Sequence, residues 1–146
     1  MGTQQILLIV LSVIIVGIAV AVGITMFANQ AENANRQALV GDLQNFGAAA
    51  MAFWRMPASM GGAGSSTFGN NTAAVRAGVG QYMGFAAAGT LTNDNGTYTL
   101  AEIGANDVFT ITALGNEIGQ NGSSGVRAVL TVTATNASPL STNVTN

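Results

Sequence analysis

Few side chains in this chain could do catalytic chemistry, and their types exclude the common catalytic groups. Histidine, cysteine and lysine are absent, so no Ser-His-Asp triad, Cys-His pair or zinc site with nitrogen and sulfur ligands can form. The charged side chains are Glu32, Arg36, Asp42, Arg55, Arg76, Asp94, Glu102, Asp107, Glu117 and Arg127. The two closest acids, Glu102 and Asp107, stand five positions apart, so only the fold could pair carboxylates. We therefore expect no enzyme, no catalytic residue, no metal and no cofactor.

One glycine-rich stretch could be taken for a phosphate-binding loop. It reads MGGAGSSTFGNN and runs from Met60 to Asn71. The stretch lacks the lysine of a P-loop, and its glycines do not have the spacing of a dinucleotide-binding turn. Glycine, serine and asparagine are typical of turns, so residues 57–71 are predicted to be a flexible connector.

The charge content favours a membrane or an assembly as the environment of the chain. Charged residues make up 7% of the 146 residues, against about 25% in an ordinary globular domain. A surface with so few charges disperses a lone soluble monomer poorly. Nucleic acid is not an expected partner, because neutralising phosphates takes clustered lysine and arginine.

Much of the apolar content lies at the start of the chain. No charge occurs from Ile6 to Phe27, a run long enough for the ~20 residues that a helix needs to cross a bilayer. A cleaved secretory signal is the first alternative, but the preceding residues carry no lysine or arginine, and the run exceeds the usual ~7–15 residues. A helix that is apolar all round must be surrounded by lipid or by identical helices. Residues 1–28 are therefore predicted to be a transmembrane or filament-core helix.

The helical pattern continues beyond the apolar run. Apolar side chains recur at spacings of 4, 3, 4 and 3, which places them on one face of a helix: Leu39, Leu43, Phe46, Ala50 and Phe53. Polar Asp42 and Gln44 lie between these positions, and polar Asn35 precedes them. The helix should end near Arg55, because the residue before Pro57 is disfavoured in the α region. Residues 29–56 are thus predicted to be the amphipathic continuation of one helix of about fifty residues.

Residues 72–146 are predicted to form a small β-rich head with a polar tail. Apolar and polar residues alternate with period two in GTYTLAE (96–102), DVFTITAL (107–114) and GVRAVLTVTAT (125–135). Strands of this kind form an antiparallel meander whose apolar face can cover the helical stripe. A short helix capped by Asn71 or Thr72 is expected, and residues 135–146 are expected to form a loosely ordered tail. The predicted fold class is α+β: a long N-terminal helix packed on a small C-terminal antiparallel sheet.

This plan resembles that of the type IV pilins and their pseudopilin relatives. The segment MGTQQILLIVLSVIIVGIAVAVGITMF is similar to a mature pilin N-terminus with Met1 in the first place. The Met-Gly-x-Gln-Gln start and the GG-G pattern within Met60–Gly64 also resemble a group of small bacterial pilin-like proteins. Pilins usually have glutamate at the fifth position, paired with a neighbour's amine, whereas Gln5 stands here. Val22 occupies the place of a proline that commonly breaks the pilin helix, so a continuous helix is expected.

The resemblance implies a structural role rather than an activity. The expected function is that of a major subunit held in the inner membrane by its helix and then polymerised, with pilus assembly machinery, into an extracellular helical filament of many copies. The expected assembly residues are Met1, Gln5, Gly17 and Gly23, and N-methylation of Met1 would accompany processing. Whether Met1 is the initiator or a processed end stays open. The alternative is a single-pass, membrane-anchored envelope protein, or a minor pseudopilin, whose head binds a partner.

Overall fold

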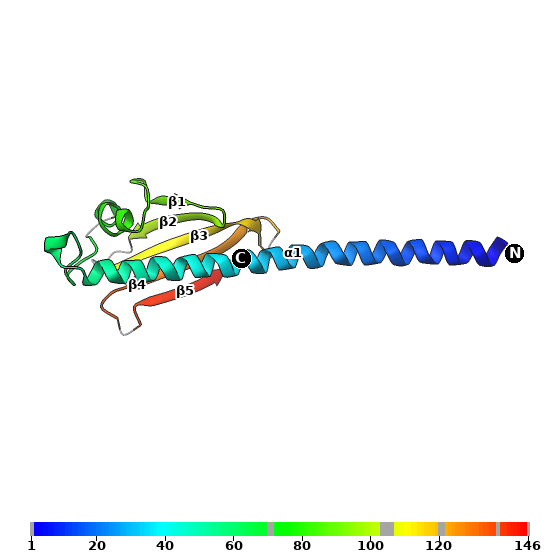
Figure 1. Ribbon diagram of the computed structural model, residues 1–146, viewed down its shortest axis with the longest axis horizontal. Helices are drawn as coiled ribbons and strands as arrows, with labels where there is room; N and C mark the ends of the chain where they lie inside the picture. The colour runs from blue at the N-terminus through cyan, green and yellow to red at the C-terminus, as the bar shows by residue number, and fades with distance from the viewer. Residues whose placement is uncertain (1, 70–71, 103–106, 120–121, 137, 146) are drawn as a thin grey trace.

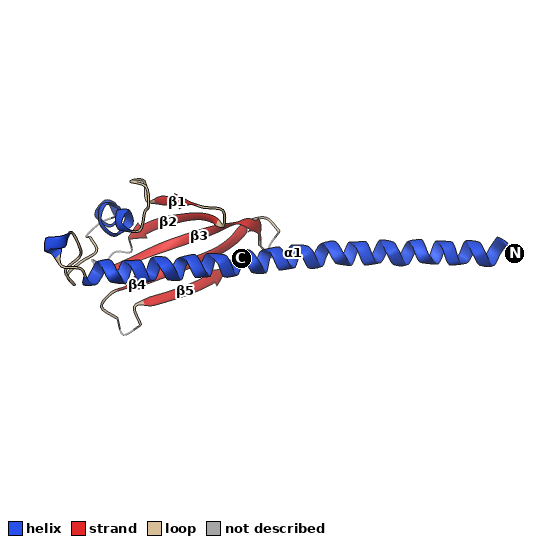
Figure 2. Ribbon diagram, in the orientation of Figure 1, coloured by secondary structure: helices blue, strands red, loops and turns tan. Residues whose placement is uncertain are grey.

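A computed structural model describes residues 2–69, 72–102, 107–119, 122–136 and 138–145, and it places a small head along the C-terminal half of one long helix (Figure 1). The helical elements are α1 (Gly2–Arg55), the 3-10 turn η1 (Ala58–Met60), α2 (Thr72–Val75) and the π-helical turn η2 (Arg76–Gly80). The strands are β1 (Thr90–Thr92), β2 (Gly96–Glu102), β3 (Val108–Ile118), β4 (Gly125–Thr133) and β5 (Leu140–Thr145). The sheet lies against α1, with the short helices at the end of the head farthest from the N-terminus (Figure 2). The predicted α+β class is confirmed.

Helix α1 runs for 54 residues, which corresponds to a length of about 80 Å. It ends at Arg55, as predicted, because Met56 precedes Pro57 and cannot easily keep the α conformation. Gly17 and Gly23 lie inside the helix without interrupting it. The single helix expected from the two consecutive patterns, one apolar and one amphipathic, is therefore present in the chain.

The glycine-rich connector after α1 folds back onto the helix end. The amides of Ala63 and Ser65 donate hydrogen bonds to the carbonyls of Phe53 and Trp54, at 3.1 and 2.9 Å. These carbonyls are among those that a helix end leaves without a partner inside the helix. The segment predicted to be a flexible connector therefore caps α1, and its residue Phe68 packs in the core.

The five strands form an antiparallel meander in the order β1-β2-β3-β4-β5. The three predicted strands correspond to β2, β3 and β4, and the short helix expected after Asn71 is α2, although Asn71 itself lies outside the described residues. The prediction of a loosely ordered tail is wrong for residues 140–145. This segment pairs with β4 as an edge strand, with Thr145 opposite Arg127 and Leu140 opposite Val132.

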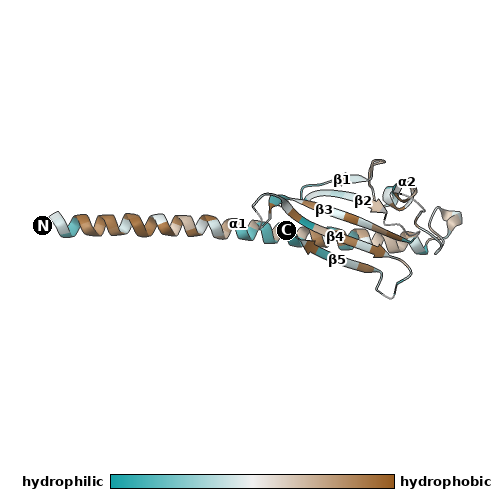
Figure 3. Ribbon diagram, turned by 180° about the vertical axis from the view of Figure 1, so that it is seen from behind, coloured by the Kyte–Doolittle hydropathy of each residue, from teal (hydrophilic) through white to brown (hydrophobic). Residues whose placement is uncertain are grey.

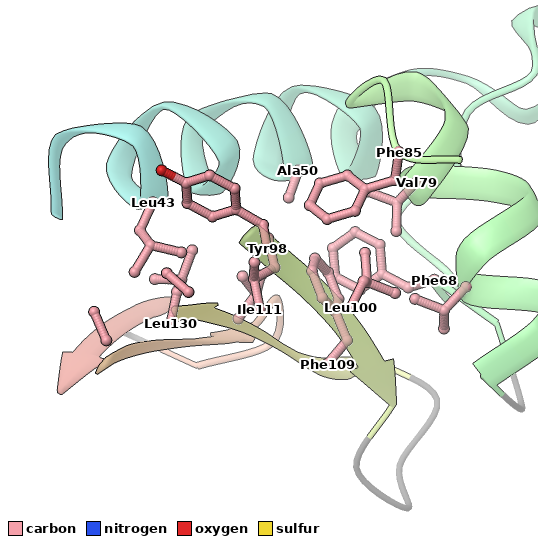
Figure 4. Close-up of a cluster of buried hydrophobic side chains, with 14 of the residues drawn as sticks. Leu43, Ala50, Phe68, Val79, Phe85, Tyr98, Leu100, Phe109, Ile111 and Leu130 are labelled. Carbon is pink, nitrogen blue, oxygen red and sulfur yellow. The ribbon is translucent and has the colours of Figure 1, made fainter. Parts of the chain in front are cut away.

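The core lies between the second half of α1 and the inner face of the sheet. From the predicted helical stripe, Leu39, Leu43 and Ala50 are fully buried and Phe53 nearly so. They meet alternate residues of the three central strands: Tyr98, Leu100, Phe109, Ile111, Ala113, Val126, Ala128, Leu130 and Val132. Figure 4 shows Leu43 and Ala50 of the helix facing residues of the sheet that include Tyr98, Ile111 and Leu130. The head therefore closes its own core using only the C-terminal half of α1.

Phe46, the remaining member of the stripe, lies at the border of this core. It is half-buried, and its ring contacts those of Phe85 and Tyr98 edge to face, with centroids 5.3 and 5.2 Å apart. Gly47, next to it, is buried where β5 approaches the helix. A Cβ added to Gly47 would lie 2.9 Å from Cδ2 of Leu140. The absence of a side chain at Gly47 thus lets the edge strand reach α1.

Candidate membrane and assembly surface

The N-terminal half of α1 is an apolar rod that the rest of the chain does not cover. Sixteen large apolar side chains between Ile6 and Phe27 are exposed, from 50% at Val10 to 76% at Phe27. In Figure 3 the ribbon of this half is mostly in the hydrophobic colour, whereas the ribbon of the head has mixed colours. Uncovered apolar surface of this extent marks a site of contact with a membrane or with other proteins. By length and composition, α1 is one helix among the described residues that could cross a membrane.

The two polar side chains within this rod are satisfied by the helix itself. The hydroxyl of Ser12 donates to the carbonyl of Ile9 at 2.8 Å, and that of Thr25 donates to the carbonyl of Ala21 at 3.0 Å. A hydroxyl bonded back to the preceding turn needs no water or partner. Because backbone and side-chain donors from Ile6 to Phe27 find acceptors locally, the rod can enter a fully apolar environment.

The two glycines expected to act in assembly have no role within the single chain. A Cβ added to Gly17 or Gly23 would meet no atom within 4 Å, so internal packing does not require glycine at either place. At about 100° per residue the two positions lie about 120° apart around the helix axis, on different faces. Gly23 also borders a hollow of about 200 Å³ together with Met26, Phe27 and Gln30. Close approach by partners on more than one side would account for both glycines.

Of the other two expected assembly residues, the structure describes Gln5. Gln5 is exposed in α1, far from the head (Figure 1), and Met1 lies outside the described residues. The structure therefore does not bring Gln5 together with Gly17 or Gly23. All three are available to partners along the length of one uncovered helix.

A polar cluster joins α1 to the turn before β2, and it was not foreseen from the sequence. The Oδ2 atom of Asp42 accepts hydrogen bonds from the Tyr98 hydroxyl at 2.5 Å, from Asn95 Nδ2 at 2.8 Å and from Asn93 Nδ2 at 3.0 Å. Nearby, Asn35 Nδ2 donates to the carbonyl of Asn95 at 2.8 Å. We call Asp42, Asn93, Asn95 and Tyr98 the Asp42 cluster. Asn93, Asn95 and Tyr98 lie more than fifty positions after Asp42 in the sequence, so no local pattern could pair them with it.

The electrostatics of the Asp42 cluster suit a structural clamp. Partial burial alone would raise the pKa of the Asp42 carboxyl, but the hydrogen bonds from Tyr98, Asn95 and Asn93 outweigh it and hold the pKa below its usual value. Burial, and then the hydrogen bond and charge of Asp42, raise the pKa of the Tyr98 phenol. At neutral pH the carboxylate is thus charged and the phenol is protonated, which is the combination that their hydrogen bond requires.

Comparison with known proteins adds no relative to this picture. No family model, curated protein or solved structure matches the chain. Among the described residues no group of three or more acidic side chains is placed to hold a metal ion. Among the described residues, the apolar rod is the feature whose exposure is not explained by the packing of the chain itself.

Proposed function

We propose that this chain is a structural subunit that polymerises through α1 into an extracellular, type IV pilus-like filament. One observation carries the proposal: the head closes its own core, while the apolar half of the same helix is left wholly uncovered. The role is architectural rather than enzymatic. Before assembly, the apolar half would hold the chain in the inner membrane as a single-pass protein.

The free-energy cost of exposing the apolar rod to water is large compared with the stability of a folded domain. Burying one large apolar side chain is worth roughly 1.5–3 kcal/mol, so sixteen of them amount to roughly 25–50 kcal/mol. A folded domain is stable by only about 5–15 kcal/mol. An isolated chain in water would therefore bury the rod by aggregation. A bilayer or a bundle of like helices removes the same surface from water.

Transfer from lipid to a helical polymer brings no further hydrophobic gain, because lipid tails are as apolar as the side chains. Association must then come from close packing, which small residues permit. Gly17 and Gly23 supply such positions on two faces of α1, as a helix with neighbours on several sides would need. Extraction from the bilayer would require the pilus assembly machinery.

The alternative is a single-pass, membrane-anchored envelope protein, or a minor pseudopilin, whose head binds a partner. The uncovered rod supports this alternative as well, since a membrane anchor has the same length and composition. In lipid alone, glycine on two faces of the helix brings no helix–helix packing, whereas in a polymer it does. We therefore favour the polymer, and filament formation distinguishes the two.

The test is electron microscopy of material sheared from cells that produce the chain, with membrane fractionation in parallel. We expect filaments from the wild type. Gly23→Leu should still insert in the membrane but yield few or no filaments, because a large side chain would hold neighbours apart. The matched control is Val22→Leu, which keeps an already large position large and should yield normal filaments.

Two results would contradict the proposal. Wild-type protein found only in membranes, with no filaments, would favour the membrane-anchored protein. Normal filaments from Gly23→Leu would remove the packing argument. Mass spectrometry of the filament subunit would also show whether its N-terminus is an N-methylated Met1, as the resemblance to pilins implies.

A further inference from the structure

The face of the sheet turned away from α1 is built mainly from threonine. The pairing registers align these residues in rows across neighbouring strands, such as Thr92, Thr97, Leu114, Arg127 and Thr145. Nine threonines share the face: Thr90, Thr92, Thr97, Thr99, Thr110, Thr112, Thr131, Thr133 and Thr145. Figure 3 looks onto this side of the sheet. It is thus a surface of hydroxyl and methyl groups, almost without charge.

A hollow of about 470 Å³ opens in this face, which we call the threonine hollow. Its lining residues are Thr97, Thr99, Thr112, Leu114, Ser124, Gly125, Arg127 and Thr145. The volume lies within the ~300–1,000 Å³ range of small-molecule sites. Five of the eight lining residues carry a hydroxyl group, and Leu114, 48% exposed, adds an apolar surface. The hollow therefore combines many hydrogen-bonding groups with one apolar contact.

Arg127 is the one charged residue in the lining of the hollow. Its side chain is exposed, and within the described part of the chain it has no carboxylate partner. By contrast, Arg36 forms an ion pair with Glu32 at 2.6 Å. A guanidinium can bind a carboxylate through two parallel hydrogen bonds. Arg127 is thus accessible to pair with an anionic ligand bound in the hollow.

We propose that the threonine hollow binds an acidic sugar, a carboxylated unit of a polysaccharide. Hydroxyl side chains both donate and accept hydrogen bonds, which matches the hydroxyl groups of a sugar. Arg127 pairs with the carboxylate, and Leu114 packs against the C–H face of the ring. An anionic phospholipid would satisfy Arg127 but would leave most of these hydroxyl groups without ligand partners. The inference concerns one head and does not depend on polymerisation, so it can fail or hold separately from the proposed function.

The experiment is calorimetric titration of the full chain in detergent micelles with trigalacturonate. We expect the wild type to bind it at least about tenfold more tightly than neutral maltotriose, because a charged hydrogen-bonding pair is lost with the neutral sugar. Arg127→Gln should weaken trigalacturonate binding about tenfold or more, with Arg127→Lys between the two. Thr112→Val, which keeps the shape and the strand preference, should weaken binding several-fold.

The matched control is Arg55→Gln, the same change at an exposed arginine outside the hollow, which should leave binding unchanged. Circular dichroism should show the sheet intact in every variant, and Arg127→Lys keeps the test valid if Arg127→Gln misfolds. Absence of binding, or equal binding by wild type and Arg127→Gln, would overturn the proposal. Equal binding of triglutamate would mean that charge alone is recognised, which also overturns it. Arg127-dependent binding to phosphatidylglycerol vesicles without binding to trigalacturonate would assign the hollow to a membrane instead.

Discussion

Removing the Asp42 carboxylate should loosen the head from α1. In Asp42→Ala the Tyr98 hydroxyl, on a residue with no exposed surface, loses its acceptor, and Asn93 and Asn95 lose theirs. A buried donor left unpaired costs about 1–3 kcal/mol. The two asparagines are more exposed and can turn to water, so they add little. We expect Asp42→Ala to lower the free energy of unfolding of the head by about 1–3 kcal/mol.

The partner variant Tyr98→Phe separates the hydrogen bond from the packing of the ring. It removes the hydroxyl but keeps the aromatic contact with Phe46, so its cost should be about 1–2 kcal/mol. In the double variant with Asp42→Ala the unpaired hydroxyl is gone. The destabilisation of the double variant should therefore be smaller than the sum of the two single destabilisations by about 1 kcal/mol or more.

The assay is urea denaturation of the full chain in mild detergent, followed by tryptophan fluorescence. Trp54 is the single tryptophan of the chain, and it is buried against Phe68 in the head, so its signal reports on the head and not on the apolar rod. Gln44→Ala is a suitable control, because Gln44 is exposed on the same helix. A wild-type urea midpoint for Asp42→Ala, or full additivity in the double variant, would refute the clamp.

The same cluster predicts how the stability of the head depends on pH. The pKa of Asp42 is lowered in the folded chain, so its contribution is present above the unfolded value of about 3.9 and is lost as pH falls through the folded pKa. The pKa of Tyr98 is raised, so its contribution is present below the unfolded value of about 10 and is lost as pH rises above it. Asp42→Ala should flatten both arms relative to the wild type. An acid loss of equal size in both proteins would show that other carboxyl groups are responsible.

Five further substitutions test the core, the backbone and the assembly surface. Leu43→Ala, at a fully buried position, should cost about 2–5 kcal/mol in the same urea assay, and a wild-type midpoint would contradict the packing of α1 on the sheet. Gly96→Ala should destabilise the head by about 1–3 kcal/mol in the same assay, because its Cβ would lie 2.2 Å from the carbonyl oxygen of Leu114. Gly41→Ala should instead stabilise α1 by up to about 1 kcal/mol, because a Cβ there meets nothing within 4 Å. Gln5→Glu should still form filaments and Gln5→Leu should form fewer, since only the former keeps a hydrogen-bonding group for a neighbour's N-terminus; normal filament yield from Gln5→Leu, counted by electron microscopy, would mean that the residue has no part in assembly.

The elements that could be predicted from the sequence are those with a strong local pattern. The end of α1 follows from Pro57, and the bounds of β2 follow from strict alternation in GTYTLAE. Edge strand β5 has no such pattern: of its residues only Val144 is partly buried and packed against the core. Its pairing with β4 supplies the hydrogen bonds that hold it, and a pairing partner cannot be read from a polar segment alone. The three-residue β1 was missed because it is too short to show a period.

The polar positions on α1 show a second reason for failure. Asn35, just before the apolar stripe, and Asp42, within it, are polar, yet both are half-buried and bonded to the turn before β2. Helical periodicity gives the direction of a side chain to within a turn, but the border of a packed face depends on what lies opposite. Here the opposite element is a turn about fifty to sixty positions away. For assembly, the sequence identifies the apolar rod as the contact surface. Which positions of the rod contact a partner depends on neighbouring copies, which no pattern within one chain encodes.

The segment of α1 between the apolar rod and the head is stabilised differently from both of its neighbours. From Ala28 to Ala34 the side chains are exposed except for Glu32, so neither an apolar environment nor the sheet supports α1 there. Asparagine at positions 29 and 33 is a weak helix former, which leaves local contacts to hold the conformation. The ion pair between Glu32 and Arg36, four residues apart, is such a contact, although a pair at this spacing on a helix adds only about 0.3–0.5 kcal/mol. Helix α1 can nevertheless stay continuous here, because both flanking segments are helical and only propagation, without a new nucleus, is required across the seven residues between them.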